Sequence, residues 1–195
     1  MKNLKVDDIQ EIIQLLKEGA VIAYPTETSY AIGCDAKNTK AVAKVFAIKD
    51  RPTGKGTPII IPNSHNPEQY ILLSSEAQRL AEKHWPGALN IIGHRQPKSQ
   101  VSELCETGGT QSIRKSSSSV ASQLATLLDR PLVATSANKS GEQAIYDPAI
   151  IQQQFGDSNL AAIVDVGVLP ITLASTTIDC TADIAKIVRQ GGLQL

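Results

Sequence analysis

Short apolar runs alternate with segments of helical periodicity along the whole chain, and this alternation narrows the possible folds more than any other feature. Asn38 is placed to cap one helix, and Gly19 is placed to end another, which begins with Asp8 and Glu11 in capping-box spacing. The pattern predicts an α/β fold with a mixed sheet and leaves the strand order open. The predicted strands are residues 20–24, 58–61, 89–93, 131–135, 162–165, 176–180 and 185–188, and further helices are predicted over residues 39–48, 75–84, 119–128 and 148–156.

The length of 195 residues predicts a single domain over residues 1–195. No uncharged apolar run approaches the ~18–20 residues of a membrane span. The first residues turn acidic before any apolar block, which argues against a signal peptide. Cys34, Cys105 and Cys180 lack the spacing of a zinc site or a disulfide framework. We therefore expect a cytoplasmic protein with reduced thiols and no membrane contact.

The charges balance overall but are unevenly distributed. The chain has 19 Lys and Arg and 19 Asp and Glu, which argues against non-specific nucleic-acid binding as its main task. Residues 37–55, however, are strongly basic, with Asp50 as the one acid among them. A locally basic stretch in a neutral chain favours a small anionic ligand over a polyanion.

Two polar segments near the first predicted strand could carry chemistry. The sequence YPTETSY, residues 24–30, places hydroxyls and a carboxylate just after a strand, where open α/β sheets bind ligands. A polar turn explains the same residues and is the simpler interpretation. KDRPTGKG, residues 49–56, offers Lys49, Arg51 and Lys55 beside two glycines, a combination that suits phosphate, although a solvated basic loop is favoured for a charge run alone.

Four later segments add hydroxyls and cations. In TQSIR, alternation places Thr110, Ser112 and Arg114 on one face of a strand, which suits a carboxylate or phosphate, while a polar edge strand is an equally good explanation. TSANKSG, residues 135–141, consists largely of small residues, as close approach of a ligand to the backbone requires. STTID and RQG follow at residues 175–179 and 189–191. No Ser/His/Asp order or carboxylate pair indicates covalent or glycosidase-type catalysis.

The order of these segments is more specific than any one of them. YPTETSYAIGCDA, KDRPTGKG, WPG, TQSIR, TSANKSG, STTID and RQG, taken in this order, resemble the YrdC-like family of threonylcarbamoyl-AMP synthases from about residue 19 to residue 191. The length is similar to that of the short, single-domain bacterial form. The resemblance implies a single domain with a twisted mixed sheet flanked by helices and with a basic concave face.

The resemblance also implies a reaction. The family converts L-threonine, bicarbonate and ATP into threonylcarbamoyl-adenylate, pyrophosphate and water, with Mg²⁺ expected to accompany ATP and no protein-bound metal site. Partner proteins then transfer the threonylcarbamoyl group to the adenosine next to the anticodon in tRNAs that read codons beginning with A. The implied partners are therefore ATP, L-threonine, bicarbonate and those downstream tRNA threonylcarbamoyl-transfer proteins, with weak binding of tRNA itself.

Family roles carry over onto matching motif positions. In this mapping, charge neutralisation and positioning replace a protein nucleophile. The implied threonine contacts are Thr28, Arg114, Ala134 and Ser175; the implied ATP contacts are Arg51, Lys55, Thr110, Ser136, Asn138 and Arg189; and the implied catalytic cations are Lys49, Arg51 and Lys55.

One departure from the family pattern leaves an alternative open. Lys115 and the serine run, residues 116–119, stand where relatives usually have an apolar residue, then Pro or Thr, and a His-Pro pair. This puts the setting of Arg114 in question, although one serine could cap the helix that follows. The alternative is a non-synthase paralogue that binds nucleotide or double-stranded RNA or tRNA; the TSAN and STTID motifs argue against it, and zero net charge and few aromatic residues weaken the RNA version.

Overall fold

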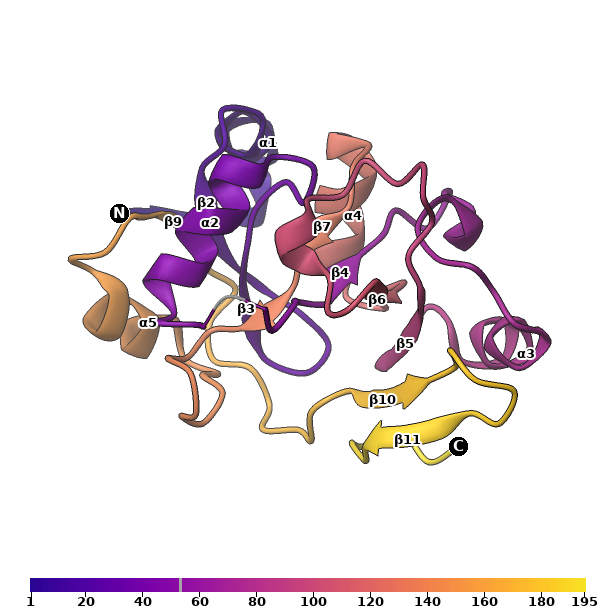
Figure 1. Ribbon diagram of the computed structural model, residues 1–195. Coiled ribbons are helices and arrows are strands. Elements are labelled where there is room, and N and C mark those ends of the chain that lie inside the picture. Colours follow the sequence, from indigo (N-terminus) through magenta and orange to yellow (C-terminus); the bar gives the residue numbers. More distant parts are fainter. Residues whose placement is uncertain (53) are drawn as a thin grey trace.

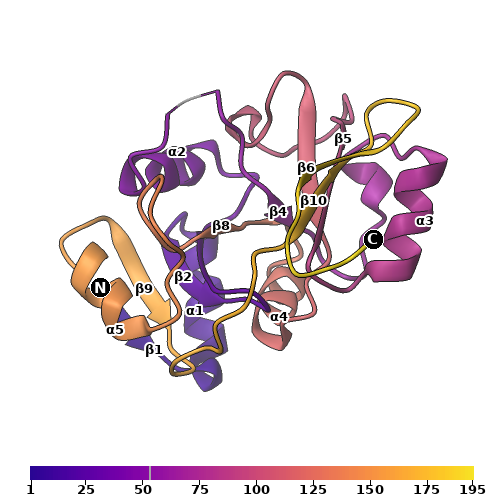
Figure 2. The ribbon, with the colours of Figure 1, turned by 90° about the horizontal axis from the view of Figure 1, so that it is seen from below.

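The computed structural model describes residues 1–52 and 54–195 and confirms an α/β fold, but with two mixed sheets rather than one (Figure 1). Helices cover both sheets, and α5 and α3 lie at opposite ends of the molecule in Figures 1 and 2. None of the helices in the described part of the chain combines the length and apolar character that a membrane crossing needs. The helices are α1 (Ile9–Lys17), α2 (Thr39–Ile48), α3 (Ser75–His84), α4 (Ser119–Leu128) and α5 (Pro148–Phe155).

The first sheet has five strands in the order β1-β9-β2-β3-β8. Its parallel part joins β1 and β2 to either side of β9, and β3 and β8 extend it as antiparallel strands. β2 is buried along its whole length, as its apolar sequence predicts. The bounds are β1 (Lys2–Leu4), β2 (Val21–Pro25), β3 (Tyr30–Gly33), β8 (Thr135–Ser136) and β9 (Leu160–Val164).

The second sheet has six strands in the order β11-β10-β5-β6-β4-β7. β6 pairs with β5 on one side and β4 on the other, so the edge-strand explanation of TQSIR is wrong. The bounds are β4 (Ile59–Ile60), β5 (Leu89–His94), β6 (Thr110–Arg114), β7 (Leu132–Val133), β10 (Thr176–Asp179) and β11 (Lys186–Arg189).

The two sheets meet where a single predicted strand is divided. Residues 131–135 form β7 in the second sheet and the start of β8 in the first, with Ala134 at the crossing. The backbones approach closely here, because a Cβ added to Gly33 of β3 would lie 1.8 Å from the carbonyl oxygen of Val133. β3 of the first sheet and β7 of the second are therefore in direct backbone contact at this junction.

Helix caps follow local sequence with one exception. Asn38 caps α2, and Ser118 of the serine run caps α4, as expected. The predicted capping box of Asp8 and Glu11 is wrong, because a short 3-10 turn precedes α1 and directs the Asp8 carboxylate to the amide of Lys5. α1 and α4 lie side by side and share an apolar cluster (Figure 2), while α2, α3 and α5 pack into the other cluster.

Candidate active site

Two adjoining cavities form the candidate site, the smaller at the junction of the sheets and the larger along the second sheet. The smaller, about 260 Å³, is lined by Arg51, Arg114 and Arg189, and we refer to it as the arginine cavity. The larger, about 500 Å³, shares Asn90 and Arg189 with it and extends along β5, β6 and β10. We refer to it as the neighbouring cavity. The basic residues expected on a concave face are thus represented here by three arginines within a cleft.

The four residues assigned to threonine by family resemblance all line the arginine cavity. Thr28 lies in the turn between β2 and β3, and Arg114 ends β6. Ala134 lies at the crossing from β7 to β8, and Ser175 directly precedes β10. Four separate segments therefore bring these side chains to one cavity.

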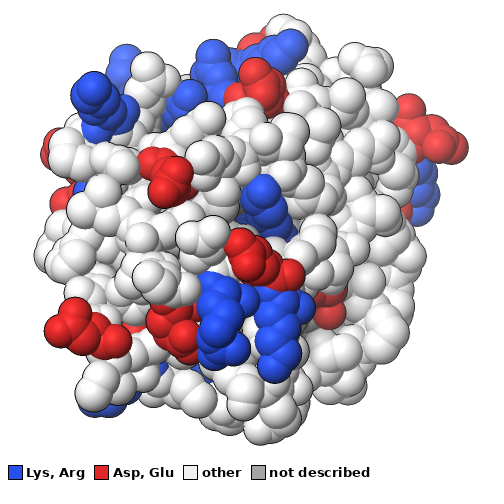
Figure 3. Space-filling model, turned by 90° about the vertical axis from the view of Figure 1, so that its right-hand side faces the viewer, with Lys and Arg blue, Asp and Glu red and all other residues white. Residues whose placement is uncertain are grey.

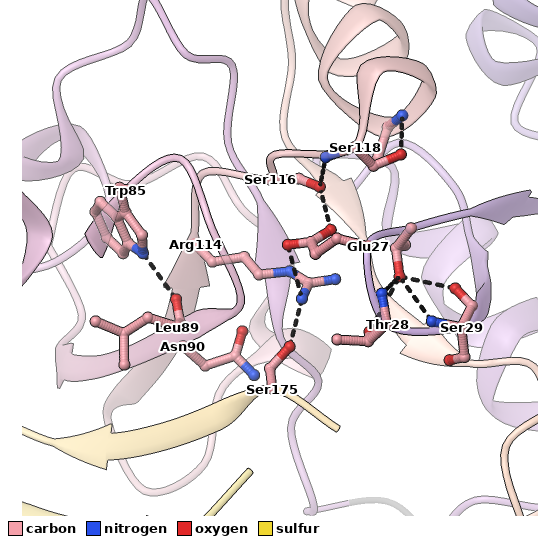
Figure 4. A network of polar contacts seen from close by, with 12 residues as sticks. Glu27, Thr28, Ser29, Trp85, Leu89, Asn90, Arg114, Ser116, Ser118 and Ser175 are labelled. Carbon is pink, nitrogen blue, oxygen red and sulfur yellow. Dashed lines mark hydrogen bonds and ion pairs between the residues drawn. The ribbon is translucent and has the colours of Figure 1, made fainter. Parts of the chain in front are cut away.

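Arg114 is the buried centre of this cavity. Its side chain is only 6% exposed, and Nη1 donates a hydrogen bond to Oγ of Ser175 at 2.5 Å (Figure 4). The same Nη1 lies 3.3 Å from Oε1 of Glu27. Among the described residues, Nε has no partner. The arginine is thus fixed through one nitrogen and keeps an unpaired donor, although a buried polar group without a hydrogen bond is costly.

The serine run supports this arrangement. Ser116 is fully buried, and its hydroxyl donates to Oε2 of Glu27 at 2.5 Å. The hydroxyl of Ser118 accepts from the first turn of α4 and lies 3.2 Å from the carbonyl oxygen of Pro25, at the end of β2. The question that Lys115 and the serine run raised about the setting of Arg114 is therefore answered: Arg114 is buried and is not a solvated charge at a sheet edge.

The three cations of the basic loop, residues 49–56, lie in three different environments. Arg51 lines the arginine cavity and donates from Nε to the carbonyl oxygen of Lys55 at 2.9 Å, while burial lowers its pKa. The side chain of Lys55 is exposed and lines neither cavity. Thr53 of the same loop lies outside the described residues.

Lys49 is turned into the interior. It is 2% exposed, and its ammonium donates to the backbone carbonyl oxygens of Ser136 and Asn138. Burial, followed by repulsion from Arg51, lowers the pKa of Lys49 to about 8. The side chain thus holds the backbone of the TSAN segment against the end of α2.

The residues assigned to ATP are distributed between the cavities. Thr110 lines the neighbouring cavity, Ser136 lines the arginine cavity, and Arg189 lines both. Nε of Arg189 donates to the carbonyl oxygen of Ser175 at 3.0 Å, and burial, then repulsion from Arg114, lowers the pKa of Arg189. Asn138 lines neither cavity, because its amide donates to the backbone of its own loop.

Sequence reasoning assigned no role to three residues of this site. Glu27 was visible as the carboxylate of YPTET, but nothing indicated that it faces Arg114. Asn90 lines both cavities, and its buried Oδ1 has no partner among the described residues. In the sequence, Asn90 could have been recognised as a polar amide within the apolar predicted strand 89–93. Ser116 carried no signal of its own: the serine run raised a question about the setting of Arg114, but serine runs are typical of loops.

The site is suited to binding anions rather than to nucleophilic attack by the protein. Three guanidinium groups and several hydroxyls line the arginine cavity, and guanidinium forks match carboxylate and phosphate. The neighbouring cavity contains Arg189 and hydroxyls together with the carboxylate of Asp179. On the face shown in Figure 3, by contrast, Lys and Arg are interspersed with Asp and Glu among mostly uncharged residues. Fold and site together define an α/β protein with a cleft suited to small anionic ligands.

Comparison with known proteins identifies the family. The family model for Sua5, YciO and YrdC proteins, described as "Telomere recombination", matches residues 14–191, so the chain belongs to the Sua5/YciO/YrdC family. The resemblance to YrdC-like proteins is thereby confirmed. A Pyrococcus abyssi protein named threonylcarbamoyl-AMP synthase is 34% identical over 185 residues, which cover 92% of this chain and 53% of that protein.

Solved structures agree with the fold. P. abyssi Sua5 complexed with L-threonine superposes with a TM-score of 0.90 at 29% identity, over 98% of this chain and 57% of that chain. E. coli YciO superposes with a TM-score of 0.85 at 25% identity, over 97% of this chain and 92% of that chain. The chain spans about half the length of the first curated relatives that it matches, 53% and 54% of theirs.

Proposed function

We propose that the protein is a threonylcarbamoyl-AMP synthase, a nucleotidyltransferase that makes threonylcarbamoyl-adenylate from L-threonine, bicarbonate and ATP. Curated relatives at 34% and 33% identity carry this name, which supports the synthase over a non-synthase paralogue that binds nucleotide or RNA. The product would pass to proteins that transfer its threonylcarbamoyl group to tRNA. We propose that this protein itself binds tRNA only weakly.

The observation that carries the proposal is the convergence on the arginine cavity. Thr28, Arg114, Ala134 and Ser175 surround a space of about 260 Å³, which fits an amino acid rather than a whole nucleotide. Arg114 supplies a buried cation, and its Nε, unpaired among the described residues, offers a donor to a carboxylate. We assign the threonine carboxylate to this guanidinium.

The neighbouring cavity is the proposed site of the nucleotide. Its volume of about 500 Å³ is in the range of ligand pockets, and it opens to the arginine cavity at Asn90 and Arg189. Arg189, which lines both cavities, and Arg51, which lines the arginine cavity, would neutralise phosphate charge. No group of three His, Cys, Asp or Glu in residues 1–52 and 54–195 could hold a metal ion, so we propose that Mg²⁺ enters bound to the phosphates of ATP.

The reaction requires the protein to position the two substrates and to neutralise the charge of the phosphates. Bicarbonate takes up a proton and loses water to give CO₂, and the threonine amine adds to this CO₂ and loses a proton to give a carbamate. A carbamate oxygen then attacks the α-phosphorus of ATP, and the bond to the β-phosphate breaks to release pyrophosphate. Holding the two reactants in adjoining cavities makes this displacement effectively intramolecular. Arginines that neutralise the developing charge lower the barrier further.

The proposal is tested by pyrophosphate release without tRNA. The full chain is incubated with ATP and Mg²⁺, and threonine or bicarbonate is omitted in turn. Release that needs both supports the synthase. Release that needs tRNA, or that proceeds equally well without threonine, would contradict it and favour the nucleotide-binding paralogue. A steep loss of tRNA binding with added salt would identify an RNA-binding protein instead.

A further inference from the structure

We propose that Ser116 is a positioning residue of the threonine site and acts through Glu27 on Arg114. The inference rests on the proposed function, because it concerns the arginine assigned to the threonine carboxylate. Ser116 is the first residue of the serine run, one of the segments in which this chain departs from the pattern that the family resemblance implies. The inference gives that departure a role in substrate binding.

Continuous contacts lead from Ser116 to the arginine cavity. The hydroxyl of Ser116 donates to Oε2 of Glu27 at 2.5 Å, and the backbone N–H of Ser118 donates to the same hydroxyl at 3.2 Å. The hydroxyl is therefore oriented from one side and directed at the carboxylate. The other carboxylate oxygen, Oε1, lies 3.3 Å from Nη1 of Arg114 (Figure 4).

These contacts orient the guanidinium through Nη1. Nη1 of Arg114 is held between Glu27 and Ser175, and both contacts are buried. Two-point binding of a carboxylate needs two N–H groups in one plane, so a tilt of the plane breaks one of the two bonds. Without the Ser116 hydroxyl, Oε2 of Glu27 would lose its hydrogen bond in a buried place. The carboxylate would then reorient and release Arg114.

The chain itself provides matched controls. Ser117 is the next residue, has the same side chain and is exposed. Capping of α4 belongs to Ser118, whose hydroxyl accepts from the amide of Ala121, so Ser116→Ala keeps the capping hydroxyl but removes the acceptor of the Ser118 N–H. Ser116→Ala removes the hydroxyl, Ser116→Thr keeps it, and Ser117→Ala removes a neighbouring hydroxyl that makes no contact with Glu27 in the described residues.

The test compares L-threonine with L-threoninamide, which lacks the carboxylate charge. Affinities of both ligands are measured by calorimetry for the full-length wild type and for the variants. We expect Ser116→Ala to weaken threonine about 3- to 10-fold, part of the loss expected for a hydrogen bond to a charged group, and to leave threoninamide within about twofold. Ser116→Thr restores threonine binding, and Ser117→Ala behaves as wild type.

Each outcome decides the proposal. Equal losses for both ligands would mean that the cavity has merely loosened, and no loss would mean that Ser116 does not act on Arg114; either result overturns the positioning role. Glu27→Gln keeps the size of the side chain, is expected to give the same selective loss, and provides an independent measurement if Ser116→Ala folds poorly. Wild-type protein that binds neither ligand overturns both proposals. Selective binding without pyrophosphate release overturns only the synthase.

Discussion

Arg114 and Ser175 are 61 residues apart in the chain and are joined inside the protein by a hydrogen bond of 2.5 Å from Nη1 to Oγ. Arg114 ends β6 and Ser175 precedes β10, and β5 lies between these strands in the six-stranded sheet. The bond therefore joins the ends of two strands that do not pair with each other. This fixes the deeply buried arginine of the cleft toward the proposed threonine site.

Replacing Arg114 by lysine should affect threonine selectively. An ammonium lacks the planar fork, so we expect Arg114→Lys to raise the KM for threonine about tenfold or more while the KM for ATP stays within about twofold. Steady-state kinetics with threonine varied at saturating ATP measures this. Arg79→Lys, on the exposed surface of α3, is the control. A change below twofold in the threonine constant would remove Arg114 from the site.

The two cations of the basic loop should differ in their effect on ATP. Arg51 lines the arginine cavity, and we assign it to the phosphates of ATP. Arg51→Ala should therefore weaken the affinity for ATP roughly 10- to 150-fold, as loss of a charge-assisted contact does. The exposed side chain of Lys55 lies outside both cavities, so Lys55→Ala should weaken ATP less, and threonine affinity should change little in either variant. Calorimetry with a non-hydrolysable ATP analogue checks both. Unchanged affinity in the two variants would count against this nucleotide site.

The buried Lys49 should give the protein a specific pH dependence of stability. Its pKa is lowered to about 8 in the folded state, against the ordinary lysine value of 10.5. Between these values the unfolded chain holds a proton that the folded chain has lost, so the free energy of unfolding contributed by Lys49 rises with pH. Urea unfolding of wild type and Lys49→Met from pH 7.5 to 10.5 should show a difference in unfolding free energy, wild type minus variant, that rises with pH. Parallel curves would contradict the buried environment.

Gly33 should be intolerant of any side chain, because the sheets meet there. A Cβ would lie 1.8 Å from the carbonyl oxygen of Val133, which belongs to rigid backbone. We expect Gly33→Ala to cost about 3 kcal/mol or more, at the upper end of overpacking. Gly108→Ala has open space and should cost only the roughly 1–2 kcal/mol of a left-handed backbone. Similar unfolding midpoints in urea for the two variants would argue against the close junction.

Local elements could be predicted from the sequence because their signals are local. The bounds predicted for α2 and α4 match those observed, since caps and apolar periodicity lie within each helix. The division into two sheets could not be predicted, because it depends on pairing between strands that are distant in sequence. β7 pairs with β4 in the second sheet, whereas β8 pairs with β3 in the first. β3 was missed because it is only four residues long and directly follows a polar turn.

The candidate site, too, could be predicted only in part. Motifs indicated Thr28, Arg114, Ala134 and Ser175, and the fold brings all four to one cavity. The direction in which each side chain points could not be predicted from the sequence. Lys49 looked like the other cations of its loop, yet it turns inward to backbone carbonyls because α2 ends directly against the TSAN segment. Whether each assigned residue contacts substrate stays a prediction.

The most direct test of the proposed function follows the carbon of bicarbonate. Labelled bicarbonate is incubated with the full chain, threonine, ATP and Mg²⁺, and nucleotide products are separated without adding tRNA. The account predicts label in an adenylate that also contains threonine, formed only when all three substrates are present and strongly reduced in Arg114→Lys at low threonine. An adenylate without label, or no labelled nucleotide under any condition, would contradict it.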